Sequence, residues 1–427
     1  MVDCFPVILP RKVTTRLRCA PPLGDESRGL RFRLGASATD ADLDVARTGD
    51  LLMTASENTG EKWHEPVADL TAHAGAPRVV ISILNWKRWR DTVECLESLR
   101  NLTTQADYLC VVVDNGSRDG SADKIHAWAE ANLGASRAIA DYPGEAALRG
   151  GAGDIERAID AAPSPARLVL IRNRENLGFS GGNNVSITYA LSRRCAADYV
   201  FLLNNDAAVE ADCLERLLAV DRSTGAGVVG PLMMNSDGTR IEFACSGSLK
   251  SLFFSPLLKS YTLMPDAGVP YWESLFVNGG AILVRRQVLE ALRTAPGSYL
   301  DERLYLYWEE VAFCHAAWEK GFRCLIVRAA IVRHKVERSA SGYQSPIWYY
   351  YSGRNRVLLS KELLLPRWRP LFHLTHIPLR FASMIKHLSA GRYDCARAIF
   401  WGMVDGYRGV SGRWKHHDEV TKDYGQS

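Results

Sequence analysis

Short uninterrupted runs of β-branched and aliphatic residues, separated by segments of helical periodicity, constrain the fold of this chain more than any other feature. A strand buried on both faces of a sheet reads as such a run, and strands that alternate with helices predict a mostly parallel sheet flanked by helices. The runs lie at 79–84, 109–113, 168–171, 199–203, 228–232 and 278–284. The helices are predicted at 89–99, 121–133, 184–194 and 309–320. The fold class is therefore α/β.

Three regions differ in composition. Residues 1–76 are polar and lack a sustained hydrophobic period, which predicts a poorly ordered or accessory extension. Residues 77–340 carry the alternating pattern, and residues 341–427 are predicted to be helical, basic and aromatic. Within the α/β region, the Gly/Ala/Pro-rich stretch 134–165 is predicted as an inserted loop, either folded over a ligand or a surface excursion.

Composition excludes several classes of protein. With 427 residues, 47% of them hydrophobic, the chain can bury a sizeable core, and a net charge of +4 gives no reason to expect nucleic acid as a partner. The ten cysteines form no C-x-x-C pair, which favours a reducing compartment. The first residues show no signal-peptide pattern, and no window of about 18 apolar residues occurs. We therefore expect a cytoplasmic protein.

Polar residues follow the fourth predicted strand directly, as Asn204-Asn205-Asp206. Parallel α/β sheets bind ligands at the carboxyl ends of their strands, and oxygen ligands suit Mg²⁺ or Mn²⁺. The sequence thus indicates a cation held against a diphosphate, while an ordinary turn after a strand remains the alternative.

A glycine-rich segment, Asn176 to Asn184, lies between a predicted strand and a predicted helix. Glycines there let the backbone approach a ligand closely, and a helix N-terminus offers free N–H groups to phosphate. The segment matches neither G-x-x-x-x-G-K-[ST] nor G-x-G-x-x-G, so the NTPase and dinucleotide signatures are absent. A plain glycine-rich loop stays open as an interpretation.

Two further features are weaker in isolation. Glu309 and Glu310 open a predicted helix, where acids are favoured by the helix dipole, although such an acid could also take a proton from an acceptor hydroxyl. His334 follows an apolar segment, where a histidine is more often structural than a ligand.

The order of these blocks resembles glycosyltransferase family 2, and within it the bacterial rhamnosyltransferase and galactofuranosyltransferase branch. The resemblance covers about 78–340 and extends more loosely to 410. It rests on these segments: 80–85, 111–121, 176–184, 203–206, 278–281, 307–310, His334 and Tyr350–Asn355.

The resemblance implies a GT-A fold with a nucleotide-binding α/β domain and a divalent cation, Mg²⁺ or Mn²⁺. It implies that Asp114 binds the uracil or thymine ring, that Asp206 and His334 hold the metal, and that Glu310, with Glu309 beside it, is the catalytic base. The nucleotide and donor would be lined by Asn85, Asp114, Asn115, Asn176, Gly178, Gly181, Asn183, Asn204 and Asn205. Two residues depart from the pattern: Glu310 stands where the base is usually aspartate, and Ala312 replaces a common acid.

The expected activity is inverting transfer of a sugar from a nucleoside-diphosphate donor to a hydroxyl of a glycan or polyprenyl-linked glycan in cell-surface polysaccharide synthesis. The resemblance of Tyr350–Asn355 and the tail to rhamnosyltransferases favours dTDP-rhamnose as the donor, and UDP-galactofuranose or a UDP-hexose remains open. A non-catalytic nucleotide-sugar or glycan-binding protein is the alternative. A nucleotidyltransferase would carry a basic glycine-rich signature near the first strand, which residues 85–89 do not match.

The C-terminal region allows two interpretations. Ile377, Phe381, Ile385 and Leu388 recur at helical spacing beside Arg380, Lys386 and His387. This pattern indicates either an amphipathic face resting on the anionic inner membrane surface or helices packed on the α/β domain with basic side chains reaching solvent.

Overall fold

The computed structural model describes residues 75–244, 249–254, 268–335 and 344–421. Contacts divide the chain into Met1–Glu65 and Pro66–Ser427, and the described residues all belong to the second unit. The predicted extension 1–76 thus lies outside the described residues except for its last two positions. None of the described helices combines the length and the apolar character that a membrane span requires.

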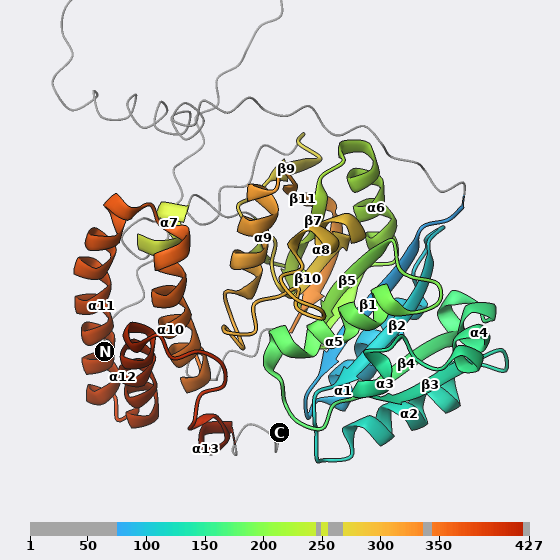
Figure 1. The fold of residues 1–427 in the computed structure, drawn as a ribbon, viewed down its shortest axis with the longest axis horizontal. Coiled ribbons are helices and arrows are strands. Elements are labelled where there is room, and N and C mark those ends of the chain that lie inside the picture. The colour runs from blue at the N-terminus through green and yellow to red at the C-terminus, as the bar shows by residue number, and fades with distance from the viewer. Residues whose placement is uncertain (1–74, 245–248, 255–267, 336–343, 422–427) are drawn as a thin grey trace, which may run out of the picture. The chain divides into compact units, whose positions relative to one another are not determined.

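A central sheet organises the described part of the chain (Figure 1). Its hydrogen-bonded order is β3-β4-β2-β1-β5-β10-β7-β11-β6, with β8 paired to β7 and β9 paired to β11. The strands are β1 (Arg78–Asn85), β2 (Asp107–Asp114), β3 (Ala138–Pro143), β4 (Arg167–Arg172), β5 (Tyr199–Asn204), β6 (Ala207–Val209), β7 (Gly227–Asn235), β8 (Ile241–Phe243), β9 (Tyr271–Glu273), β10 (Ala281–Arg285) and β11 (Arg323–His334).

The direction of the strands changes across the sheet. From β3 to β5 all neighbours are parallel. Strand β10 is antiparallel to β5 and β7, whereas β11 runs parallel to β7 and antiparallel to β6 and β9. A central sheet flanked by helices is confirmed, and its parallel character is concentrated in the half that contains β1, β2 and β5.

Helices cover both faces of the sheet. Successive side chains of a strand point to opposite faces, so a strand that is apolar at every position needs a core on each side. Val79 and Ile81 pack in a core with α1 (Trp89–Arg100), α2 (Ser121–Asn132) and α6 (Cys213–Thr224). Val80 packs in the core of the other face. That second core includes residues of α3 (Gly144–Ala147), α4 (Gly153–Ala161), α5 (Gly178–Ser192), α8 (Arg286–Leu292) and α9 (Glu309–Glu319).

The prediction of an inserted loop at 134–165 was wrong. This stretch contains β3, α3, α4 and the 3₁₀ helix η1 (Ser164–Ala166), and β3 extends the sheet beside β4. Buried Glu156 anchors it, since it pairs with Arg193 (3.0 Å) and accepts hydrogen bonds from the Tyr142 and Tyr189 hydroxyls at 3.0 and 2.8 Å. The composition does not reveal these helices and this strand, because a short Gly/Ala/Pro-rich element has the same residue content as a loop.

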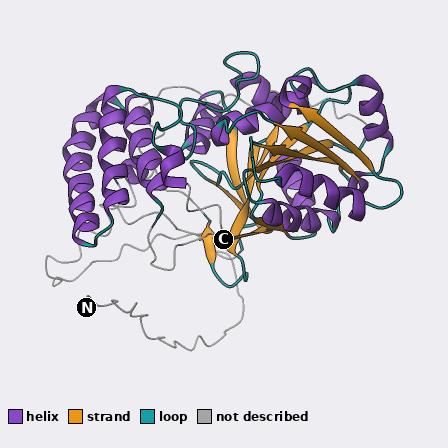
Figure 2. Ribbon diagram, turned by 90° about the horizontal axis from the view of Figure 1, so that it is seen from below, coloured by secondary structure: helices purple, strands orange, loops and turns teal. Residues whose placement is uncertain are grey.

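The C-terminal region is helical, as predicted (Figure 2). It comprises α10 (Pro346–Leu363), the 3₁₀ helix η2 (Pro366–Trp368), α11 (Arg369–Ser389), α12 (Tyr393–Arg408) and α13 (His417–Thr421), and the short α7 (Leu249–Phe254) precedes it in the chain. Buried aromatic contacts hold it together, such as the Tyr350 ring stacked on Trp414 with ring centroids 4.4 Å apart.

Helix α11 has two different faces. Phe372, His376 and His387 are buried, and Arg380 donates a hydrogen bond to the Tyr349 carbonyl (2.8 Å). The opposite face is exposed, up to 72% at Leu374. Its exposed apolar side chains are Leu371, Leu374, Ile377, Phe381, Ile385 and Leu388. Arg380 and His387 therefore do not flank the apolar stripe as the sequence pattern indicated, whereas Lys386 is exposed.

Candidate functional site

The carboxyl ends of β1 and β2 bring two polar side chains together, because Asn85 and Asp114 are partners in the parallel register. Asn85 Nδ2 donates to Asp114 Oδ1 (2.7 Å), and the Ser117 backbone N–H donates to Asp114 Oδ2 (3.1 Å). Burial raises the pKa of Asp114 above its usual value, although the hydrogen bonds from Ser117 and Asn85 oppose this shift. Each carboxylate oxygen can accept a second hydrogen bond, as a ligand N–H would require.

Asn115 connects this edge to the glycine-rich segment. Its Nδ2 donates to Asn176 Oδ1 and to the Gly178 carbonyl, both at 3.0 Å, and its Oδ1 accepts from the Leu177 backbone N–H (3.1 Å). The Asn115 side-chain amide thus forms its hydrogen bonds with other residues of the protein. The residue thus shapes the segment, and its side chain is buried.

The glycine-rich segment is helical over most of its length, which corrects the predicted start of this helix at 184. Helix α5 begins at Gly178, whose φ of +74° favours glycine. A Cβ atom there would lie 2.4 Å from the Tyr305 carbonyl oxygen. Gly181 and Asn183 lie in the first turns of α5 and are buried, and Asn183 Nδ2 donates to the Phe179 carbonyl (3.0 Å). Close packing within the protein accounts for these glycines.

Strand pairing brings Asp206 and His334 together. In the antiparallel register of β11 and β6, His334 faces Ala207, the residue after Asp206. His334 Nε2 lies 3.1 Å from Asp206 Oδ1 and 3.3 Å from Asn204 Nδ2. Asn205 points elsewhere, because its Nδ2 donates to Thr92 Oγ1 (3.1 Å) at the start of α1. Of the Asn204–Asp206 triplet, the first and third residues therefore meet His334.

Sequence reasoning missed Glu242, a lone acid on β8 without any motif around it. Its Oε2 lies 3.7 Å from His334 Nδ1, so the imidazole stands between two carboxylates. Burial disfavours the charged imidazole, but hydrogen bonding and charge attraction from Asp206 and Glu242 outweigh it and raise the pKa of His334.

The group around His334 is also the candidate site for a divalent cation. Within the described ranges, no three or more His, Cys, Asp or Glu side chains form a ready metal cage. However, Asp206 Oδ1 and Glu242 Oε2 are buried, and apart from the His334 ring nitrogens that face them neither has a hydrogen-bond donor among the described residues. Buried carboxylate oxygens in this state fit a cation, and Mg²⁺ commonly takes only one or two protein carboxylates together with substrate phosphates. The residues present therefore fit the expected metal.

A strained turn precedes Glu309 and Glu310. Tyr305, Tyr307 and Trp308 have φ values of 64°, 67° and 77°, a region that side chains other than glycine rarely adopt. Each such residue costs on the order of 1–3 kcal/mol and persists only where surrounding contacts impose it. Strain concentrated in one turn marks a candidate functional segment.

The two acids differ in exposure. Glu309 is buried, and burial together with the Glu310 charge raises its pKa well above the usual value. Glu310 is partly exposed, and burial raises its pKa to about 7 against two backbone hydrogen bonds. Burial also raises the pKa of Tyr307 to about 12, with contributions from the charges of Glu309, Asp206 and Glu310. An acid whose pKa lies near 7 is suited to proton transfer.

The segment Asn278–Gly280 connects the acids to the cation group. A Cβ on Gly279 would lie 3.5 Å from Glu310 Cβ, and one on Gly280 would lie 3.4 Å from Asn204 Nδ2. Asn204 in turn meets His334. Through this segment, Glu310 is connected to the group formed by Asn204, His334 and Asp206.

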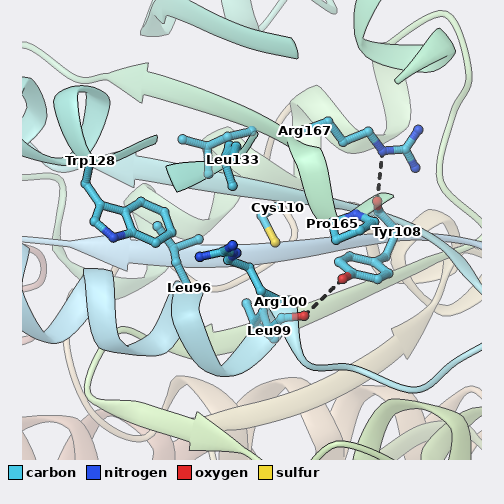
Figure 3. A pocket seen from close by; sticks show the side chains of 10 residues that line it. Leu96, Leu99, Arg100, Tyr108, Cys110, Trp128, Leu133, Pro165 and Arg167 are labelled. Atoms are coloured by element: carbon cyan, nitrogen blue, oxygen red, sulfur yellow. Dashed lines mark hydrogen bonds between the residues drawn. The ribbon is translucent and has the colours of Figure 1, made fainter. Parts of the chain in front are cut away.

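A separate small pocket lies away from these residues (Figure 3). It is lined by ten residues between α1, α2 and the sheet, including Leu99, Tyr108 and Arg167, and none of them belongs to the predicted site. Its volume of about 10 Å³ is at the lower limit of what one water molecule needs. It cannot hold a nucleotide.

Parts of the chain are similar to known proteins. Residues 153–293 match the family described as "Glycosyl transferase family 2". A relative, "Low-salt glycan biosynthesis hexosyltransferase Agl10" from Haloferax volcanii, is 26% identical over 196 residues. The match covers 44% of this chain and 58% of the relative, so this chain spans little more than half of that protein's length.

Weaker similarities to solved structures also occur. A mannosyltransferase from Pyrobaculum calidifontis, PcManGT, in complex with GDP-Man and Mn²⁺, is 14% identical with a TM-score of 0.47, covering 85% of this chain and 96% of that one. S. aureus TarS is 13% identical with a TM-score of 0.41, covering 70% and 43%. GalNAc-T7 with UDP, GalNAc and Mn²⁺ is 13% identical with a TM-score of 0.43, covering 71% and 55%.

Proposed function

We propose that this protein is an inverting, divalent-cation-dependent glycosyltransferase that uses a nucleoside-diphosphate sugar as donor. The observation that carries the proposal is the linkage of Glu310, Asn204, His334 and Asp206 along the Asn278–Gly280 segment. A proton acceptor and a cation-binding group must lie side by side for this chemistry. The family match over 153–293, which includes Asp206 and the Asn278–Gly280 segment, supports it.

In the proposed reaction, Glu310 takes the proton of an acceptor hydroxyl. The hydroxyl oxygen then forms a bond to the anomeric carbon of the donor sugar, while the bond from that carbon to the diphosphate oxygen breaks on the opposite face. The configuration inverts, and the nucleoside diphosphate leaves with the bonding electrons. When bound at Asp206 and His334, a divalent cation supplies positive charge that stabilises the departing diphosphate.

The nucleotide end of the donor would lie at Asn85 and Asp114. Asp114 accepts two hydrogen bonds from the protein and retains lone pairs for the imide N–H of uracil or thymine. The diphosphate would extend towards Asp206, since β1 lies between β2 and β5 in the sheet. Asn176, Gly178 and the first turn of α5 would border the sugar.

The donor sugar is proposed to be rhamnose, carried as dTDP-rhamnose. The support is the resemblance of Tyr350–Asn355 to rhamnosyltransferases rather than a contact, because the side chains of Arg354 and Asn355 are fully buried. A hexose is the competing donor, since the curated relative is called a hexosyltransferase.

The acceptor is proposed to be a hydroxyl of a glycan, either free or linked to polyprenyl diphosphate at the cytoplasmic face of a membrane. The exposed apolar stripe of α11 supports the membrane-bound form, with exposed Arg367 and Lys386 close to it. A helix with this distribution can lie in the interface of an anionic bilayer.

One observation favours a second candidate, a non-catalytic nucleotide-sugar-binding protein. Glu310 stands where an aspartate is expected from the resemblance, and the extra methylene moves the carboxylate by about 1 Å or more. Such a protein would bind the donor without turnover.

A donor panel separates the candidates. The thermal stability of the protein is measured with dTDP-rhamnose, UDP-galactofuranose and UDP-hexoses, each with and without Mn²⁺. A donor present at about 100 times its Kd should stabilise the fold by roughly 2.7 kcal/mol. The stabilising donor is then offered with a glycan acceptor, and NMR of the product reports the anomeric configuration. Retention of configuration would exclude the mechanism, and binding without release of the nucleotide would favour the second candidate.

A further inference from the structure

A buried amide on α10, that of Asn355, binds the strained turn at Leu304–Trp308 at three points. Asn355 Nδ2 donates to the carbonyls of Leu304, Leu306 and Tyr307 at 3.0, 2.9 and 2.7 Å. These three acceptors lie within four consecutive residues, so the one amide group imposes the path of the chain immediately before Glu309.

Arg354 supports the same turn and orients Asn355. Its Nη2 donates to the carbonyls of Leu304 (2.7 Å) and Arg303 (3.1 Å), and its Nε donates to Asn355 Oδ1 (2.9 Å). The bond to Oδ1 directs the Asn355 amide nitrogen towards the turn. Both side chains are fully buried, so neither is placed to touch a substrate.

The other side of the turn contacts the glycine-rich segment. The Phe179 backbone N–H donates to the Tyr305 carbonyl (2.7 Å), and the Tyr305 hydroxyl donates to the Asn176 carbonyl (3.3 Å). Gly178 lies directly against Tyr305, with no room for a Cβ. The turn therefore lies between the segment proposed to border the donor sugar and the pair of residues on α10.

We propose that Arg354 and Asn355 are positioning residues that hold the Leu304–Trp308 turn against the glycine-rich segment and thereby fix the carboxylate of Glu310 relative to the donor sugar. This inference deepens the proposed function and rests on it. In the sequence analysis, the segment that contains Arg354 and Asn355 bears on the choice of donor. The proposal instead gives these two residues of α10 a role in positioning Glu310.

A purely structural role is the competing explanation. It predicts that removing the Asn355 amide lowers stability and changes activity only through the amount of folded protein. The positioning role predicts a change in the folded enzyme itself. A displacement of about 1 Å at a reacting group can cost about 10²-fold in rate.

The test compares Asn355→Leu with Ile399→Ala. Leucine has a similar size to asparagine but has no donor for the three carbonyls. Ile399 is fully buried on α12, and its aliphatic side chain makes no hydrogen bond to the turn. Its truncation should therefore lower stability while leaving the hydrogen bonds of the turn intact. Both proteins are assayed at a temperature where each is folded.

For Asn355→Leu we expect kcat to fall on the order of 10²-fold, with the donor KM changed by much less. Loosening the turn should also hydrate Glu310, which faces Glu309, Tyr307 and Cys314, so the acidic limb of the pH–rate profile should move to lower pH. Ile399→Ala should keep the wild-type kcat, and the acidic limb of its pH–rate profile should lie at the wild-type pH. Equal behaviour of the two variants overturns the proposal.

Hydrogen exchange of the backbone amides at 305–310 tests the positioning without any activity. These amides should exchange faster in Asn355→Leu than in Ile399→Ala, and equal exchange rates contradict the role of Asn355. If the wild-type protein transfers no sugar from any donor, the proposed function fails, while the exchange result still decides whether the amide holds the turn. If Asn355→Leu does not fold, Asn355→Ser, which retains one hydroxyl donor, replaces it in both comparisons.

Discussion

Asp206 Oδ1 lies 3.1 Å from His334 Nε2, although the two residues belong to segments far apart in the chain. The antiparallel pairing of β6 and β11 brings them together, and the Lys335 backbone N–H donates to the Asp206 carbonyl (3.0 Å) directly beside them. The side-chain pair is therefore built on a backbone hydrogen bond. This arrangement leads to the first prediction.

We expect Asp206→Asn to remove the Mn²⁺-dependent part of donor binding, because a neutral amide is a weaker ligand for a hard cation. The measurement is a thermal-shift titration with donor in the presence and absence of Mn²⁺. Arg333→Gln is the matched control. Arg333 directly precedes His334 on β11, but its side chain forms an ion pair with Glu210 (2.5 Å). A full Mn²⁺ response in Asp206→Asn would remove Asp206 from the metal site.

Glu310→Gln should fold and bind donor but transfer sugar about 10²–10⁴-fold more slowly, the typical loss when a general base is removed. Glu309→Gln is the informative comparison. Burial raises the pKa of Glu309 well above its usual value and so favours its neutral form, which glutamine resembles. We expect a much smaller loss for Glu309→Gln in single-turnover assays. Equal losses would assign the proton transfer to the pair rather than to Glu310.

The pH dependence follows from the pKa of Glu310, which burial raises to about 7. A base acts in its deprotonated form, so kcat/KM should fall about tenfold per pH unit below that value. A profile that stays flat down to about pH 5 would contradict this assignment.

Folding stability should depend on pH with a defined sign. Between the usual glutamate pKa of 4.5 and the raised value of about 7, the folded state binds more protons at Glu310 than the unfolded state does. The free energy of unfolding should therefore decrease as the pH rises through this window. Glu310→Gln should reduce that slope, as denaturant titrations at about pH 5 and about pH 8 would measure.

Gly178→Ala should lower the free energy of unfolding more than alanine does at another glycine of positive φ. Gly178 and Gly134 have φ values of +74° and +83°, but a Cβ meets the Tyr305 carbonyl at 2.4 Å only at Gly178, whereas Gly134 faces open space. Both alanines incur backbone strain, and overpacking adds about 1–3 kcal/mol at position 178. Denaturant unfolding measures the difference. Equal losses of unfolding free energy in the two variants would show that Tyr305 can move aside without an energetic penalty.

The exposed stripe of α11 should mediate binding to anionic membranes. We expect the wild-type protein to float with vesicles that contain phosphatidylglycerol, and Leu374→Glu combined with Ile385→Glu to abolish flotation. These two positions are 72% and 62% exposed, so the substitutions should leave the fold intact. Trp318→Glu, on α9 and 59% exposed, is the control for loss of any exposed apolar side chain. A wild-type protein that stays in the soluble fraction contradicts the membrane proposal.

Much of the fold was visible in local patterns. The apolar runs of β1, β2, β4 and β5 predict strands, because a strand buried on both faces must be apolar at every position. The pattern failed at 134–165, where short elements carry too few residues to show a period, and at α5, where glycines typical of loops lie in the first turns of a helix. At Gly178 the contact with Tyr305 leaves no room for a side chain, which no local rule reveals.

The sequence by itself determined the polar ends of the strands, since Asn85, Asp114 and Asn204 each terminate an apolar run and parallel strands end at the same edge. Only the tertiary structure decided which distant groups meet there. Glu242 carries no signal in the chain, and Asn355 stands out there only as part of the Tyr350–Asn355 resemblance. The contacts of both come from strand and helix packing, which places a carboxylate beside His334 and an amide against the turn before Glu309. Local periodicity specifies what is buried, whereas the partners of a buried polar group depend on contacts between segments remote in sequence.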